Sequence, residues 1–415
     1  MYHLIFADEQ GRFYDRRNLS AAGRTGDRLV EILPEDMIEL PPGASLVMLP
    51  DRAPVGLRHS FASLDRVPGT LEPAVAVGAL LPQGYTRTLL PAFRRAPAGR
   101  PLPLLGYAAV GWREGKVWTA ARRTDDPTRW APSCFNTAEL PGLVQDRLAR
   151  SNSGLLRHLA RCALEYSCYT AQNIFYRRWE GGLPVSPVCN ARCLGCISRQ
   201  PAECCPAPQS RIAAVPPLKE AVELAAGHLE QAPEAIISFG QGCEGEPSLA
   251  ADTVAGVIRQ TRARTGRGTL NMNSNAGYTA GVQKICAAGL DSVRISLISA
   301  RDEVYRAYCR PRDYSLADVR RSLAVCRDHG VHMALNLLVF PGLTDRCGEM
   351  EALLDLIEEA GVEQVQLRNL NIDPDHLWQM LRPGEDEILG IPALIDALKD
   401  IPGLEVGNFS RPLRG

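Results

Sequence analysis

Three cysteines in one short stretch are the residues of this sequence best suited to chemistry. Cys189, Cys193 and Cys196 are separated by three and two intervening residues. Thiolates at this spacing can converge on one small iron–sulfur cluster. Three ligands for a four-iron cluster leave one iron with an open position, as in a catalytic zinc site. Such an iron could chelate a small molecule that offers an amine and a carboxylate.

A zinc knuckle is the structural alternative for the same cysteines. Cys204 or Cys205 would then supply the fourth ligand. Zinc sites usually come as paired C-x2-C units, and this pattern does not have that form. Cys204 and Cys205 could instead ligate a second cluster, or be loop thiols without a metal.

The chain around this motif alternates between strand-length apolar runs and amphipathic helices, which predicts a parallel α/β sheet. The predicted strands are 183–188, 235–240, 269–273, 292–297, 333–340 and 364–370. The predicted helices are 217–231, 248–264, 279–288, 315–329 and 346–360. These βα units are fewer than a full eightfold barrel needs. They predict a partial (β/α)6 TIM-like barrel, with its site at the C-terminal ends of the strands.

The sequence before the barrel has a different pattern of apolar residues, prolines and glycines. Short apolar runs at 45–49, 74–78, 104–110 and 116–120 lie between prolines and glycines, which predicts a small β-rich domain. Apolar residues at helical spacing follow over 141–178. We therefore expect a β-rich accessory domain (1–140), a helical linker (141–181), the partial barrel (182–375) and a C-terminal helical extension (376–415).

Composition sets the broad class of protein. The chain has 415 residues, 45% hydrophobic and 22% charged, which suits a folded protein of two or three domains. Its net charge of -1 excludes a polycation that coats nucleic acid. Because no apolar run approaches a membrane span and the first residues do not resemble a secretory signal, we expect a cytoplasmic protein. Thirteen cysteines in a reducing compartment suggest metal, redox or catalytic use rather than disulfides.

The cysteine spacing after the first strand of a partial barrel resembles the radical S-adenosylmethionine (radical SAM) superfamily, over roughly residues 182–375. The segment from Gln241 to Pro247 is similar to that family's Gly-Gly-Glu-Pro loop, with Glu244 at the first glycine and Gly245 at the second. The resemblance implies that Glu246 holds the amino group of S-adenosylmethionine.

The resemblance also implies further cofactor contacts. Asn273 and Ser274 end the third strand, where the family places polar residues beside the cofactor. Arg294, Ser296 and Asn336 are implied partners for the methionyl carboxylate and the ribose hydroxyls. One position departs from the family. The residue before the third cysteine is usually aromatic and helps to cradle the adenine, whereas here it is Gly195; Ile197 or Leu338 could take over this packing.

The chemistry implied by the resemblance is reductive cleavage of S-adenosylmethionine at a [4Fe-4S] cluster, which gives methionine and a 5′-deoxyadenosyl radical. That radical would abstract hydrogen from a substrate, and a peptide, an RNA and a small metabolite all stay open. The enzyme would be oxygen-sensitive and would need a one-electron reductant such as flavodoxin or ferredoxin. The alternative function is non-catalytic, namely a metal-binding (zinc or iron–sulfur) interaction module on a degenerate barrel.

Two further cysteines are candidate catalytic residues. Cys243 lies on the loop that carries Glu246, and Cys309 follows the fourth strand, so either thiol could donate a hydrogen atom to a substrate radical. The alternative for each is a buried thiol with no part in the reaction. Cys162 is expected to be a small core residue, Cys168 falls in no pattern, and the histidines show no ligand spacing.

The N-terminal half carries the remaining alternatives. Basic and aromatic residues alternate over 83–95 and again among Trp112, Arg113, Trp118, Arg122, Arg123, Arg129 and Trp130. Such interleaving could bind nucleic acid, although a β face with an aromatic core is the simpler interpretation. We expect the N-terminal domain to dock against the barrel and border its mouth. The alternative is a position on the far side, where it would only stabilise the chain or a dimer.

Overall fold

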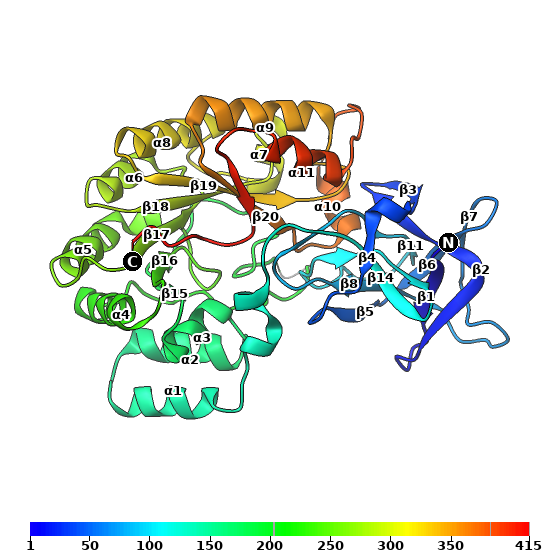
Figure 1. Cartoon of the computed structure of the whole chain (residues 1–415), viewed down its shortest axis with the longest axis horizontal. Helices are drawn as coiled ribbons and strands as arrows, with labels where there is room; N and C mark the ends of the chain where they lie inside the picture. Colours follow the sequence, from blue (N-terminus) through cyan, green and yellow to red (C-terminus); the bar gives the residue numbers. More distant parts are fainter. Residues whose placement is uncertain (202–203, 382, 415) are drawn as a thin grey trace.

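The computed structural model describes residues 1–201, 204–381 and 383–414, and it contains a β-rich N-terminal half and an α/β barrel half (Figure 1). The helical segment between them lies along one edge of the barrel. In the described part of the chain, no helix is long and apolar enough to cross a membrane.

The N-terminal half is a network of antiparallel strands. A central path runs β11-β6-β2-β1-β13-β14-β4, and the other strands pair along its sides. The strands are β1 (His3–Ala7), β2 (Phe13–Thr25), β3 (Arg28–Glu31), β4 (Met37–Glu39), β5 (Ser45–Leu49), β6 (Arg52–Leu57), β7 (Phe61–Ser63), β8 (Val75–Leu80), β9 (Tyr85–Arg87), β10 (Leu90–Pro91), β11 (Phe93–Arg95), β12 (Tyr107–Ala108), β13 (Val110–Arg113) and β14 (Lys116–Arg123). The short 3-10 helix η1 (Pro34–Asp36) lies between β3 and β4, and two more, η2 (Thr128–Trp130) and η3 (Pro132–Cys134), follow β14. The predicted β-rich character is confirmed.

The segment predicted as helical over 141–178 is divided into α1 (Leu140–Ala149), α2 (Gly154–Leu164) and α3 (Tyr169–Tyr176). Helix α2 buries one apolar face, which includes Leu155, Leu159 and Cys162. Ser153 caps its N-terminus by accepting a hydrogen bond from the Leu156 N–H at 3.1 Å. The segment packs beside the first barrel strand through α3.

The barrel half contains a curled, parallel sheet in the order of the sequence, flanked on its outer face by helices (Figure 1). The strands are β15 (Glu180–Gly182), β16 (Ile236–Phe239), β17 (Thr269–Ser274), β18 (Ser292–Leu297), β19 (His332–Val339), β20 (Gln364–Asn369) and β21 (Glu405–Gly407). The helices are α4 (Leu218–Gln231), η4 (Pro247–Ala250), α5 (Ala251–Arg262), α6 (Thr279–Cys286), α7 (Asp302–Cys309), α8 (Leu316–Asp328), α9 (Cys347–Ala360), α10 (Pro374–Met380) and α11 (Ile391–Lys399). The predicted partial TIM-like barrel is confirmed.

Three details of the prediction were wrong. The first strand is β15 rather than 183–188, because Pro184 and Pro187 lack the N–H that a sheet ladder needs. The C-terminal extension is not only helical, since β21 adds a parallel strand beside β20. Helix α7 was not predicted, although α6, which is equally short, was.

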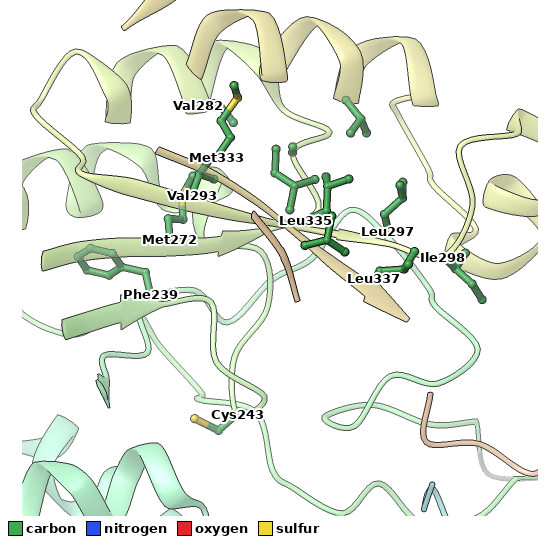
Figure 2. Packing of buried hydrophobic residues seen from close by; sticks show 14 of the residues in the cluster. Phe239, Cys243, Met272, Val282, Val293, Leu297, Ile298, Met333, Leu335 and Leu337 are labelled. Carbon is green, nitrogen blue, oxygen red and sulfur yellow. The ribbon is translucent and has the colours of Figure 1, made fainter. Parts of the chain in front are cut away.

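Alternate residues of the barrel strands face opposite sides, and the two sides differ in chemistry. Figure 2 shows apolar side chains on one side, among them Met272, Val293 and Leu335, packed toward the helices. The intervening residues are polar, for example Asn271, Arg294 and Gln366, and hydrogen-bond to one another across the strands. The barrel interior is therefore polar, in contrast to the packed branched side chains of a closed barrel.

The N-terminal half docks on the C-terminal ends of β19 and β20. Arg52 donates to the Asp373 carboxylate at 2.7 Å, and both side chains are almost fully buried. Arg87, which is also fully buried, donates to the backbone carbonyls of Leu370 at 2.8 Å and Val339 at 3.4 Å. Asn369 exchanges hydrogen bonds with the backbone of β9. The basic residues in this part of the N-terminal half therefore hold the two halves together.

We predict that Arg52→Met lowers the free energy of unfolding by about 3–5 kcal/mol, because it leaves the buried Asp373 carboxylate without its cation. Urea unfolding measures this loss, and limited proteolysis reports whether the halves separate. Arg94→Met is the matched control, since the Arg94–Asp65 ion pair is exposed and its loss should change stability far less. Equal effects of the two substitutions would contradict a buried ionic contact between the halves.

Candidate active site

The cysteine motif lies on an irregular loop that follows β15. Cys189, Cys193 and Cys196 are all partly exposed. The loop is held against the C-terminal end of α7, where the Arg192 N–H donates to the Cys309 carbonyl at 3.0 Å and the Leu194 N–H donates to the Tyr308 carbonyl at 3.1 Å. The backbone of α7 therefore fixes the path of the loop between the first and third cysteines.

The surroundings of the three thiols differ. Burial, together with the negative charge of Glu246, raises the pKa of Cys189 to about 12. A side-chain hydrogen bond with Cys309, together with burial, holds the pKa of Cys193 well above its usual range. The Arg211 guanidinium lies 3.8 Å from the Cys196 sulfur. Thiols with raised pKa values stay protonated by themselves, and a bound metal is what deprotonates them.

Gly195 has a direct steric explanation. A Cβ atom at this position would lie 2.8 Å from the Tyr308 hydroxyl and 3.4 Å from the Leu370 side chain. Tyr308 is buried, so it cannot give way easily. The aromatic residue expected before the third cysteine is therefore excluded by an aromatic residue from α7. Ile197, one of the residues expected to replace it, does line the barrel cavity.

The loop after β16 brings Glu246 close to the cysteine loop. The Gly245 N–H donates to the Ser186 carbonyl at 2.6 Å, and the Glu246 N–H donates to the Val188 carbonyl at 2.7 Å. A Cβ atom on Gly245 would lie 1.9 Å from the Val188 oxygen, so this approach requires glycine. The residues just before Cys189 and the loop that carries Glu246 therefore form one unit.

The Glu246 carboxylate is buried and accepts hydrogen bonds from a neighbouring strand end. The Ser274 hydroxyl lies 2.5 Å from Oε1, and the Asn275 N–H lies 2.8 Å from Oε2. The Asn275 side chain in turn donates to Asn190 at 2.9 Å and lies 4.0 Å from the Cys189 sulfur. The structure thus brings Glu246, Ser274 and Cys189 together and adds Asn275, which follows Ser274 in the sequence.

Glu244 has a role that the sequence did not reveal. Its buried carboxylate accepts four backbone hydrogen bonds, from the N–H groups of Val185, Ser186, Gly240 and Gln241 at 2.8, 3.0, 2.5 and 2.9 Å. Burial raises the pKa of Glu244 to about 7, against the lowering effect of these donors. Glu244, which stands at the first glycine position of the loop that carries Glu246, therefore connects the loop after β16 to the loop after β15.

The remaining predicted cofactor residues face the barrel interior rather than the cysteine loop. Arg294 donates to Gln366 at 2.9 Å and to Ser410 at 2.8 Å, and lies 3.4 Å from Glu180. Asn336 donates to Ser296 at 3.4 Å. The Asn273 side chain donates to the Gly240 carbonyl at 3.3 Å. Of the predicted cofactor residues on strands β17, β18 and β19, only Ser274 hydrogen-bonds to Glu246.

The polar barrel interior opens into a cavity of about 870 Å³. Its lining comes from both halves of the chain, with Gln83 and Leu105 from the N-terminal half beside Arg294, Asn336 and Arg368 from the barrel. Among the described residues, three buried side-chain atoms of its lining have no hydrogen-bond partner: Gln209 Oε1, Gln241 Nε2 and Asn336 Oδ1. Buried polar atoms without partners are costly, so these atoms suit a bound polar ligand.

The two candidate catalytic thiols lie outside this cavity lining. Cys309 is buried beside Cys193, against the cysteine loop. Cys243 is also buried, and Figure 2 shows its side chain below the strand ends. Its sulfur is grouped with His158 and Cys162 of α2. A role in donating hydrogen remains a prediction for both residues.

The basic and aromatic stretch over 83–95 does not form an exposed surface. Residues 86–93 are buried, and Arg87 contacts the barrel backbone. Trp130 stacks on Phe135 and Phe409 in a small aromatic core. Residues 86–93 and Trp130 are therefore structural, whereas Arg123 and Arg129 of the second set are exposed.

Cys204 and Cys205 lie in a loop beyond the motif, with their sulfur atoms 3.8 Å apart. Cys204 faces a second cavity of about 610 Å³, which Cys193 and Cys196 also line. None of these three cysteines lines the barrel cavity. A second cluster at Cys204 and Cys205 remains a prediction.

Comparisons with known proteins identify one family model and a few relatives. Residues 183–357 match the family model described as the Radical SAM superfamily. A stretch of 137 residues is 29% identical to GTP 3′,8-cyclase from Streptomyces coelicolor (strain ATCC BAA-471 / A3(2) / M145) and covers 32% of this chain. The matched stretch spans 39% of that relative.

Solved structures show a weaker likeness. The radical S-adenosylmethionine methyltransferase TsrM from Kitasatospora setae is 17% identical with a TM-score of 0.35, over 46% of this chain and 36% of its own. The FeFe-hydrogenase maturase HydG from Carboxydothermus hydrogenoformans is 17% identical with a TM-score of 0.35, over 57% and 58%. At these scores the likeness supports no inference about function.

The superfamily's cofactors are a [4Fe-4S] cluster and S-adenosylmethionine, as predicted from the cysteine spacing. The family match begins just after β15 and includes the cysteine loop, Glu246 and the strands through β19. The match to the radical SAM superfamily therefore falls within the barrel half of this chain, over residues 183–357.

Proposed function

We propose that this protein is a radical SAM enzyme whose cluster is held by Cys189, Cys193 and Cys196. The observation that carries the proposal is the unit formed by the cysteine loop and the buried Glu246 carboxylate, joined through Asn275. The alternative, a non-catalytic metal-binding module, would not need a buried carboxylate beside the thiols.

The donor set fits a cluster better than a single zinc ion. In the described part of the chain, the three sulfur atoms are not all within 4.8 Å of one another. Thiolates around one tetrahedral zinc ion lie about 3.8 Å apart, because each Zn–S bond is about 2.3 Å. Wider spacing suits a cluster with several irons.

The chemistry that these cofactors supply is one-electron cleavage of S-adenosylmethionine and abstraction of hydrogen from an unreactive C–H bond. The chain's own residues bind and orient the cofactor and the substrate. Glu246 offers a buried carboxylate to a cationic amino group, and Ser274 and Asn275 hold that carboxylate in place. The N-terminal half borders the cavity, where it would help to exclude water and choose the substrate.

The cavity points to a substrate with an anionic group. Arg368 lines it and donates to the side-chain oxygens of Gln83 at 3.2 Å and Gln366 at 3.2 Å. Burial and repulsion from Arg294 lower the pKa of Arg368 to about 9, although Glu180 and Asp125 act in the opposite direction. No ion pair to Arg368 occurs among the described residues, whereas Arg294 has Glu180. A carboxylate or phosphate on the substrate would supply the missing charge.

The second cavity suits the entry of electrons. Cys193 and Cys196 line it, together with Arg192, Arg199 and Arg310. An acidic one-electron carrier such as flavodoxin or ferredoxin fits a cationic surface at this position.

We predict that replacing Cys189, Cys193 and Cys196 together by alanine abolishes the iron–sulfur cluster. The unchanged chain, reconstituted without oxygen, should hold about four irons. Iron and sulfide analysis and visible absorption measure the difference. Cys347→Ala, at a partly exposed cysteine on α9, is the control and should keep the iron. A cluster that persists in the triple variant would move the site to other cysteines.

We predict that Glu246→Gln weakens binding of S-adenosylmethionine by about ten- to a hundredfold while the iron content is unchanged. A charge-assisted hydrogen bond is replaced by a neutral one, a difference of about 1.5–3 kcal/mol. Equilibrium dialysis with the reconstituted protein measures the affinity. Glu230→Gln, at an exposed residue on α4, is the control. An unchanged affinity would show that Glu246 does not contact the cofactor.

We predict that Arg368→Met leaves the thermal stability of the ligand-free protein unchanged or raises it, because it removes a half-buried charge that has no ionic partner among the described residues. Gln366 would keep its hydrogen bond from Arg294. Pyrophosphate should raise the melting temperature of the unchanged protein and have no such effect on the variant. Arg52→Met is the contrasting variant and should lower the melting temperature of the ligand-free protein. A large loss of stability in Arg368→Met would make this arginine structural.

A further inference from the structure

A second group of metal-binding side chains lies outside the cysteine motif. His158 and Cys162 are four residues apart on α2, and so they share one face of the helix. Cys243 reaches the same place from the loop after β16. The His158 Nε2 atom lies 3.6 Å from the Cys162 sulfur, and the three ligand atoms all lie within 4.8 Å of one another.

These separations match the coordination sphere of one ion. Zn–S bonds of about 2.3 Å and Zn–N bonds of about 2.0–2.1 Å in a tetrahedron place sulfur and nitrogen ligands about 3.5 Å apart and two sulfurs about 3.8 Å apart. Two thiolates and an imidazole are also the ligands that zinc prefers over magnesium or calcium. The group is compact, unlike the three cysteines of the motif.

Two of the three side chains are buried, next to residues that line the barrel cavity. Cys162 and Cys243 are 0% and 2% exposed, whereas His158 is only half-buried and leaves a path for an ion to enter. Cys168 lines the barrel cavity, and its N–H donates to the Cys162 carbonyl at 3.0 Å. The backbone at Cys243 is fixed as well, because its carbonyl accepts from the Ile212 N–H at 2.8 Å.

We propose that His158, Cys162 and Cys243 bind one zinc ion, with the loss of the two thiol protons, and that this ion ties α2 to the loop that carries Glu244 and Glu246. Three protein ligands leave the fourth tetrahedral position to a water molecule. The role of the ion is nevertheless structural, since Cys162 and Cys243 lie 81 residues apart in sequence (243 − 162 = 81). The ion would hold the cofactor-binding loop against the helical segment whether or not a cluster is present.

The test uses the full chain with Cys189, Cys193 and Cys196 replaced by alanine, so that the motif cannot bind metal. Purified without chelator, this protein should contain on the order of one zinc per chain. Cobalt should give the visible ligand-field bands of a tetrahedral thiolate site, and zinc-edge X-ray absorption should show sulfur and nitrogen neighbours. Adding Cys162→Ser or Cys243→Ser should lower the bound zinc at least tenfold and remove the cobalt bands.

Cys286→Ser is the matched control, because Cys286 and Cys326 form another buried thiol pair, 3.8 Å apart, without a histidine. It should retain the zinc. Circular dichroism shows which variants are folded. If a cysteine variant does not fold, His158→Ala removes a ligand at a half-buried position instead and should also lower the bound zinc. The proposal is overturned if the protein binds no zinc, if Cys162→Ser and Cys243→Ser keep it, or if thiol titration finds these two cysteines joined in a disulfide. None of these outcomes depends on cleavage of S-adenosylmethionine.

Discussion

One buried carboxylate holds together the two loops on which the active site depends. Glu244 receives two backbone N–H groups from the loop after β15 and two from the loop after β16. Each loop by itself would bury N–H groups without acceptors, which costs free energy comparable to a lost hydrogen bond. The carboxylate therefore has to be present for the loops to meet. Its own burial, seen in the raised pKa, is the energetic cost of that arrangement.

The positions of the chemical groups follow from this contact. Once the loops meet, Gly245 allows the backbone to approach Val188, and Glu246 lies next to the residues that lead into Cys189. On its other side the cysteine loop is fixed by α7, whose Tyr308 occupies the space that a side chain at position 195 would need. The cysteines are thus held by backbone contacts with two neighbouring elements, while the three residues themselves are only partly buried. Positioning of this kind is what a preorganised metal site requires.

The sequence predicted the barrel well because its strands have a simple pattern. Strands such as β18 and β19 alternate between apolar residues under the helices and polar residues inside, and their limits agree with the prediction within a residue or two. The first strand was misplaced because Leu183 and Val185 are buried like strand residues although the prolines around them prevent a ladder. The cysteine motif was visible because its ligands are close in sequence. Glu244, Arg368 and the group of His158, Cys162 and Cys243 were not visible, because their partners come from distant segments.

The polar interior explains why the two halves of the chain belong together. An open barrel lined by Arg294, Arg368 and Asn336 leaves polar groups to solvent or to ligand, unlike a core that packs by itself. The N-terminal half closes part of this opening, with Gln83 bonded to Arg368 and with the buried Arg52–Asp373 pair behind it. Because Gln83 is neutral, it satisfies a donor of Arg368 without neutralising its charge. The cavity therefore keeps a positive charge at the point where the two halves meet, so the residues that would select an anionic substrate come from both halves.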